Sequence, residues 1–148
     1  ERLTVRIDVP ERLRGLQVPA LVLQPIVENA VKHGIQSSLD GGTVTIVARV
    51  IPEWCRHAGS DGGRQLLSLE VCDTGAGATA EQVQRGRHEG IGLANVERRL
   101  RGHYGEAGSM TIASEPGGGT TVELRLPAQE PSNPTALPVV AAGGQHTR

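Results

Sequence analysis

Four short motifs combine carboxylates, amides and glycines at spacings that could form a ligand site. The first is Glu28-Asn29, followed one helical turn later by Lys32 and His33. Asn29 offers an oxygen ligand of the kind that Mg²⁺ prefers, and Glu28 could accept a proton or hold a metal-bound water. The alternative is a surface ion pair between Glu28 and Lys32, which would need no ligand.

The second motif, Asp73-Thr74-Gly75-Ala76-Gly77, follows an apolar segment with alternating polar residues. A carboxylate at this point could accept a hydrogen bond from an exocyclic amine. Gly75 and Gly77 would let a flat ring approach the backbone, because glycine has no side chain. An Asp-initiated turn without any ligand explains the motif equally well.

Two glycine-rich runs complete the set. Gly90-Ile91-Gly92-Leu93-Ala94-Asn95 opens a helical segment, whose unpaired N–H groups and positive dipole end would suit a phosphate. The run is not a dinucleotide fingerprint, because Asn95 replaces the third glycine and a polar segment precedes it. Gly117-Gly118-Gly119-Thr120-Thr121 precedes the last strand and, taken alone, indicates only a flexible hairpin turn.

The order of the four motifs carries more information than any one of them. An acid–amide helix, an Asp-x-Gly-x-Gly strand end, a Gly-x-Gly helix start and a glycine–threonine hairpin follow one another along the chain. Their separations allow a base site, a phosphate site and a metal site to surround one pocket. The joint pattern therefore predicts a nucleotide-binding domain.

The elements that must position these motifs follow from hydrophobic periodicity. Alternating residues from Leu3 to Val9 predict a half-buried strand, and an amphipathic helix is expected from 19 to 36. Pro25 should bend or loosen the first turns of that helix. Further strands are predicted from Thr43 to Ile51 and from Leu67 to Asp73, separated by a polar loop over 52–64.

The second half of the sequence continues this alternation of helices and strands. A short helix is predicted near 79–84, then a helix from Leu93 to Tyr104, then strands from Ser109 to Ser114 and from Thr120 to Leu126. Interleaved helices and strands predict an α/β (α+β) two-layer sandwich, with helices on one face of a mixed, mostly antiparallel sheet. Residues 1–127 are expected to form this domain, and residues 128–148 are expected to be a disordered tail.

Composition sets further bounds. The 148 residues are 37% hydrophobic and 21% charged, with a net charge of −1, so a packed core is expected and bulk attraction to nucleic acid is not. Two cysteines, Cys55 and Cys72, suit a reducing cytoplasm. Cys55 and His57 lie close in sequence, but no second ligand pair at zinc-site spacing appears. The chain shows no signal peptide or membrane-spanning run. It begins at Glu1 within a predicted strand and without methionine, so we expect a fragment.

The run from Val18 to Ile35, VPALVLQPIVENAVKHGI, closely resembles the N box of LytS-type sensor histidine kinases in the GHKL ATPase superfamily. GIGLANVERRL, from Gly90 to Leu100, resembles the G2 box of the same kinases. The resemblance covers about residues 1–127. It implies the Bergerat-type ATP-binding fold and the catalytic domain of a histidine kinase, with ATP and Mg²⁺ as cofactors.

The resemblance also implies roles for individual residues. Glu28 would help to activate the reaction, Asn29 would bind Mg²⁺, and Asp73 would recognise the adenine amine in a pocket shaped by Gly75 and Gly77. Lys32 and His33 could reach phosphate, and Thr120 would border the nucleotide. The phosphate end would be lined by Gly90, Ile91, Gly92, Leu93 and Asn95.

The implied reaction is transfer of the ATP γ-phosphoryl group to a histidine on a dimerisation segment outside this chain. His33 is not that acceptor, because its neighbours place it in the N box. A response regulator downstream, a monomeric fragment and the cytoplasmic part of a membrane-anchored sensor are also implied. The lack of phenylalanine, and hence of an F box, and the short lid over 78–89 both fit the LytS-type branch.

Three alternatives remain open. The domain could bind nucleotide and regulate a partner without efficient turnover. Asp73-Thr74-Gly75 after an apolar strand is also the signature of aspartic peptidases, which pair two aspartates and are nearly all strand. Within the GHKL superfamily, a topoisomerase or chaperone fragment is the third alternative, although the residues around Glu28-Asn29 favour the kinase.

Overall fold

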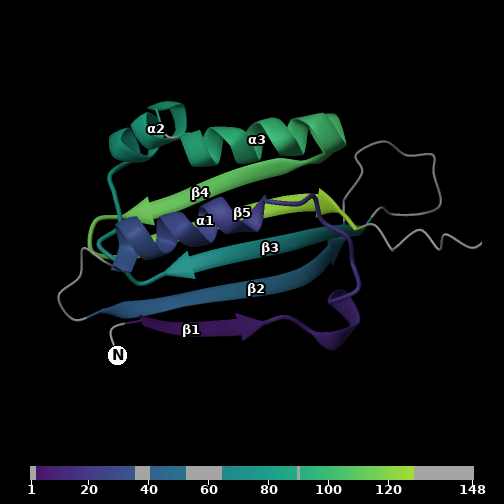
Figure 1. The fold of residues 1–148 in the computed structure, drawn as a ribbon, viewed down its shortest axis with the longest axis horizontal. Helices are drawn as coiled ribbons and strands as arrows, with labels where there is room; N and C mark the ends of the chain where they lie inside the picture. Colours follow the sequence, from purple (N-terminus) through teal and green to yellow (C-terminus); the bar gives the residue numbers. More distant parts are fainter. Residues whose placement is uncertain (1–2, 36–40, 53–64, 90, 129–148) are drawn as a thin grey trace, which may run out of the picture.

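A five-stranded sheet forms one layer of the domain. The computed structural model describes residues 3–35, 41–52, 65–89 and 91–128. Its strands are arranged in the order β1-β2-β3-β5-β4 (Figure 1). They are β1 (Leu3–Asp8), β2 (Gly42–Pro52), β3 (Gln65–Asp73), β4 (Ser109–Glu115) and β5 (Gly119–Pro127).

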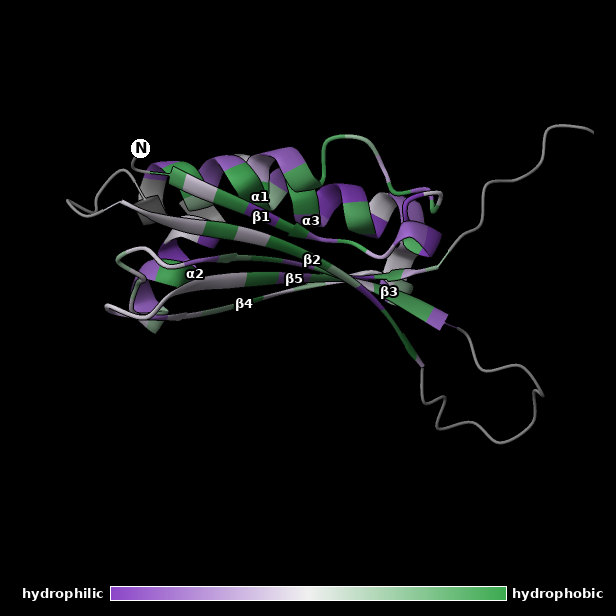
Figure 2. Ribbon diagram, turned by 90° about the horizontal axis from the view of Figure 1, so that it is seen from below, coloured by the Kyte–Doolittle hydropathy of each residue, from purple (hydrophilic) through white to green (hydrophobic). Residues whose placement is uncertain are grey.

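Helices form the second layer on one side of this sheet (Figure 2). They are α1 (Leu23–Asn29), its π-helical continuation η2 (Ala30–Ile35), α2 (Ala80–Glu89) and α3 (Ile91–Tyr104), with short 3₁₀ turns η1 (Glu11–Leu13) and η3 (Gly105–Ala107). Strands β1 and β2 are parallel, because α1 crosses over between them, and the other pairs are antiparallel. The predicted two-layer fold with a mixed, mostly antiparallel sheet is confirmed.

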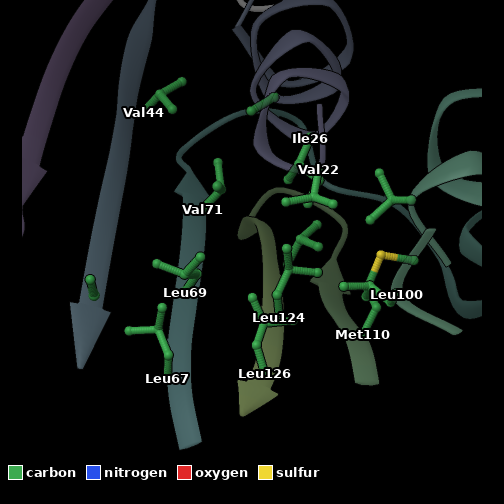
Figure 3. Close-up of a cluster of buried hydrophobic side chains, with 14 of the residues drawn as sticks. Val22, Ile26, Val44, Leu67, Leu69, Val71, Leu100, Met110, Leu124 and Leu126 are labelled. Carbon is green, nitrogen blue, oxygen red and sulfur yellow. The ribbon is translucent and has the colours of Figure 1, made fainter. Parts of the chain in front are cut away.

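The core lies between the two layers and follows the two periodicities of the sequence. In β3 the residues Leu67, Leu69 and Val71 are buried on the helix-facing side, as alternation along a strand requires. They meet Ile26 of α1 and Leu100 of α3 (Figure 3). Each such side chain, fully buried, stabilises the fold by about 1.5–3 kcal/mol.

The first strand departs from its predicted environment. All six residues of β1 are exposed, including Val5 at 57% and Ile7 at 67%, so the expectation of a half-buried strand is wrong. Val5 pairs with Val44, which is buried, so the apolar residues of β1 do lie on the helix-facing side of the sheet. They are exposed because β1 is the edge strand and the described helices do not cover it.

The N-box helix begins later than the sequence suggested. The predicted helix over 19–36 starts at Leu23, after Leu21 adopts a positive φ of 62°. Pro25 therefore falls in the first turn, where backbone N–H groups have no intrahelical acceptor and proline costs no hydrogen bond. The hydrogen-bonding pattern changes from α to π at Ala30, and single π turns of this kind often occur at functional sites.

Helix α2 is longer than predicted. The short helix expected near 79–84 runs to Glu89. The predicted loop over 52–64 and the tail from 128 lie almost entirely outside the described residues, as does Cys55. Cys72 is a free, half-buried cysteine in β3. Among the described helices, none is long and apolar enough to span a membrane.

Candidate functional site

Asp73 closes strand β3 with its side chain on the helix-facing side of the sheet. It continues the alternation of Leu67, Leu69 and Val71, and it pairs with Val44 of β2 and Thr120 of β5. Its side chain is only 8% exposed, so this carboxylate belongs to the core layer and not to the open face. A buried carboxylate needs polar partners, since leaving it unpaired would be costly.

Two backbone groups partner this carboxylate. Gly75 N–H donates to Asp73 Oδ1 at 2.9 Å, and the backbone of Thr120 also hydrogen-bonds the side chain. Burial nevertheless raises the pKa of Asp73 above its ordinary value, and these two hydrogen bonds only partly oppose the rise. An ionised carboxylate has about four acceptor positions, so Asp73 can still accept a ligand donor.

Glycines are required where the β3 end meets the β4–β5 turn. Gly77 has a φ of +62°, and a Cβ placed on it would lie 1.9 Å from the carbonyl oxygen of Glu115. Gly119 has a φ of +79°, and its Cβ would lie 2.0 Å from the carbonyl oxygen of Asp73. Close backbone packing thus explains Gly77, while Gly75 contributes its N–H group to the Asp73 carboxylate.

Ser114 is a site residue that the sequence reasoning missed. Its hydroxyl oxygen accepts a hydrogen bond from Ala78 N–H at 2.9 Å and lies 2.8 Å from the Thr120 hydroxyl. It also donates to the Gly119 carbonyl at 3.1 Å. The predicted hairpin could have suggested it, because Ser114 and Thr120 occupy paired positions across the glycine turn. Ser114 therefore joins the start of the lid to the strand that carries Thr120.

The acid–amide pair lies at the end of α1. Glu28 is exposed and accepts a hydrogen bond from Gln24 Nε2 at 3.0 Å, and the described ion pairs do not join it to the exposed Lys32. Asn29 is half-buried and lies one turn after Pro25 on the same face of the helix. His33 belongs to the π-helical turn, and its side chain lies outside the described residues.

The start of α3 lies against α1. A Cβ placed on Gly92 would be 3.6 Å from Cβ of Pro25, so the face of α1 that carries Pro25 and Asn29 faces the beginning of α3. Leu93 and Asn95 are half-buried, and Asn95 Oδ1 accepts a hydrogen bond from Arg98 at 3.4 Å. Gly90 and the side chain of Ile91 lie outside the described residues.

These elements converge at one end of the sheet. The end of β3, the β4–β5 turn, the α1–η2 segment and the α2–α3 junction all lie there (Figure 1). A buried acceptor, a helix start and an exposed carboxylate suit a base, a phosphate group and a proton transfer respectively. The described residues contain no cluster of three His, Cys, Asp or Glu side chains around a metal position. Asn29 would share a cation with phosphate oxygens and water.

A separate hollow lies at the opposite end of the sheet. Its volume is about 740 Å³, and it is lined by Arg12, Leu13, Leu16, Val50, Gln65 and Ala128. Gln65 begins β3 whereas Asp73 ends it, and eight residues of strand separate them by about 26 Å. This hollow therefore takes no part in the site around Asp73.

The sequence matches relatives that contain such a domain. It is 40% identical over 126 residues to the sensor histidine kinase BtsS of Escherichia coli (strain K12), a match that covers 85% of this chain and 20% of that protein. It is 27% identical over 137 residues to the sensor protein LytS of Enterococcus faecalis, covering 87% of this chain and 21% of that protein. The chain spans about a fifth of the length of these relatives. The predicted likeness to LytS-type kinases is confirmed.

Solved structures support the fold. The blue-light activated histidine kinase of Erythrobacter litoralis EL346 superposes with a TM-score of 0.61 at 19% identity, over 86% of this chain and 36% of that one. The mycobacterial sensor histidine kinase MprB gives a TM-score of 0.53 at 21% identity, over 87% of this chain and 84% of that one. Residues 17–130 match the family described as histidine kinase-, DNA gyrase B- and HSP90-like ATPase. The chain belongs to this family and is the ATPase domain that it shares with sensor histidine kinases.

Proposed function

We propose that this domain binds ATP with Mg²⁺ and transfers the γ-phosphoryl group to a histidine on a dimerisation segment outside this chain. The observation that carries the proposal is the buried carboxylate of Asp73, held by backbone N–H groups at the sheet end where α1 and α3 also meet. The family match supports ATP, and the relatives' names support histidine phosphorylation.

Each residue has a role that its position supports. Asp73 accepts a hydrogen bond from the adenine amine, and the first turn of α3 binds phosphate through N–H groups that lack intrahelical acceptors. Gly92, Leu93 and Asn95 lie in that turn and just after it. Mg²⁺, when bound, would neutralise charge on the phosphates. Asn29 would supply one oxygen ligand, and the exposed Glu28 would accept a proton from the attacking group.

Calorimetric titration of ATP and ADP with Mg²⁺ tests the nucleotide site. Asp73→Asn should abolish most of the binding, because an amide cannot present the same acceptors to the adenine amine and to two backbone N–H groups. Asp8→Asn is the matched control, since Asp8 lies on the edge strand with its side chain 72% exposed. Equal binding by wild type and Asp73→Asn would show that Asp73 does not recognise the base.

The second candidate is a nucleotide-binding regulatory module without efficient turnover, which the exposed position of Glu28 leaves open. Glu28→Gln distinguishes the two, with the dimerisation segment of the parent kinase and labelled ATP as substrates. A kinase should lose phosphotransfer in this variant and keep nucleotide binding. A regulatory module would show no transfer even with Glu28. The aspartic peptidase alternative is wrong, because the chain belongs to the ATPase family and helices α1 and α3 pack against the sheet in the core.

The implied partners and location belong to the same proposal. A response regulator would receive the phosphoryl group from the histidine, and the domain would work in the cytoplasm, where ATP and reduced cysteines are found. We propose that the isolated domain is a monomer. Sedimentation equilibrium would contradict this if it gave twice the 15.6 kDa mass of the chain.

A further inference from the structure

One arginine joins the lid helix to the two elements beneath it. Arg87 Nε, in the last turn of α2, donates to Glu97 Oε1 of α3 at 2.6 Å, and Nη2 donates to the same oxygen. Nη2 also donates to the carbonyl oxygen of Met110 in β4 at 3.2 Å. The two side chains are 36% and 37% exposed, so the ion pair is partly shielded from water. A single guanidinium thus ties α2 to both α3 and β4.

The contact depends on a bend of the chain between Arg87 and Glu97. Arg87 lies in α2, which is described as far as Glu89, and Glu97 lies in α3, which is described from Ile91. Arg87 and Glu97 are ten residues apart, and in one continuous helix they would be separated by about 15 Å along the axis. The ion pair can form only when the chain bends between α2 and α3, so it stabilises the bent arrangement selectively.

The same bend affects the first N–H groups of α3. In one continuous helix, the N–H groups of residues 91–93 would donate to the carbonyls of residues 87–89, within α2. A chain that bends enough to bring Arg87 to Glu97 cannot keep all of these hydrogen bonds, and α3 by itself offers its first N–H groups no acceptor. We therefore expect the bend that the Arg87–Glu97 pair stabilises to favour phosphate binding at the start of α3.

We propose that Arg87 is a positioning residue, which acts through Glu97 and the Met110 carbonyl to keep the start of α3 open to the nucleotide phosphates. The inference rests on the proposed nucleotide site and adds a residue that would not touch the nucleotide. It predicts that the phosphate contribution to binding depends on the ion pair. The adenine contribution, made at Asp73, does not.

Calorimetry with ADP and with adenosine separates these two contributions. Arg87→Gln should weaken ADP binding about three- to fivefold, the range that a partly exposed ion pair can supply, and leave adenosine binding unchanged. Arg85→Gln is the matched control, because it removes the same charge from an exposed position of α2 about 200° further round the helix. This control should bind both ligands as the wild type does.

Glu97→Gln decides between positioning and direct contact. If Arg87 bound phosphate itself, removing the Glu97 charge would release the guanidinium and strengthen ADP binding. The positioning role predicts the opposite, a weakening similar to that of Arg87→Gln. The double variant should be no weaker than the weaker single variant, because either change alone breaks the pair. Stronger ADP binding by Glu97→Gln would overturn the inference.

Hydrogen exchange tests the ion pair without any ligand. Arg87→Gln and Glu97→Gln should speed the exchange of the α2 amides about three- to fivefold, because α2 would open locally more often, while β3 keeps its protection. Unchanged exchange in α2 would overturn the inference even if nucleotide binding is normal. If the wild type binds neither ADP nor adenosine, the proposed function fails, and the exchange rates still decide the role of Arg87.

Discussion

Gly77→Ala should destabilise the domain more than any ordinary surface substitution, for two separable reasons. Gly77 has a φ of +62°, a conformation that costs alanine about 1–2 kcal/mol. The new Cβ would also lie 1.9 Å from the Glu115 carbonyl oxygen, so the β4–β5 turn would have to move. Overpacking of this kind costs about 1–3 kcal/mol, which gives a total of about 2–5 kcal/mol.

Two other glycines separate these contributions. Gly117 has a φ of +77° with no atom within 4 Å of a Cβ, so Gly117→Ala should cost only the conformational part, about 1–2 kcal/mol. Gly86 lies inside α2 and its Cβ would likewise meet nothing within 4 Å. Gly86→Ala should therefore stabilise the domain by about 0.5–1 kcal/mol.

Thermal and urea unfolding, followed by circular dichroism, measure all three variants. For a domain of this size, about 3 °C of melting temperature corresponds to 1 kcal/mol, so Gly77→Ala should melt about 6–15 °C lower. The variant should also lose nucleotide binding, because displacement of the turn moves Thr120 and its contact to Asp73. If Gly77→Ala lost no more stability than Gly117→Ala, the close approach of Gly77 to Glu115 would be refuted.

Three further predictions concern the core and two carboxylates. Leu124 is 0% exposed, so Leu124→Ala should lower the free energy of unfolding by about 2–5 kcal/mol in a urea titration. Ile7 is 67% exposed, so Ile7→Ala should change it by less than about 0.5 kcal/mol in the same titration. Arg125 lowers the pKa of Glu123 below 4.5, so this stabilisation is present above the unfolded-state pKa and is lost as the pH falls through the folded-state pKa. Arg125→Gln should flatten the acidic part of a plot of melting temperature against pH, and an unchanged plot would contradict the pair. Because burial raises the pKa of Asp73, ADP binding should weaken on acidification at a pH above 3.8, and calorimetry showing constant affinity down to that pH would contradict this.

The sequence by itself determined the family, the fold class and the strand ends at which the candidate site residues lie. Alternation in Leu67, Leu69 and Val71 is local information, and it predicted a strand that ends at Asp73. The glycine run before Thr120 determined the last hairpin in the same way. These features could be predicted because each depends on residues within a few positions along the chain.

Only the tertiary structure decided the environment of these elements. Alternation in β1 predicts an apolar side, but it cannot show that the helix layer stops before the edge strand and leaves Ile7 exposed. The late start of α1, after the positive φ of Leu21, is likewise invisible in periodicity.

The same limit applies to the contacts around the site. Gly77 could be assigned to ligand access or to backbone packing, and only its approach to Glu115 distinguishes them. Arg87 and Glu97 carried no motif, because a contact across ten residues depends on the angle between two helices. The arrangement of α2 also involves β4, through the hydrogen bond from Arg87 to the Met110 carbonyl, and β4 lies later in the chain, so no local pattern could encode it.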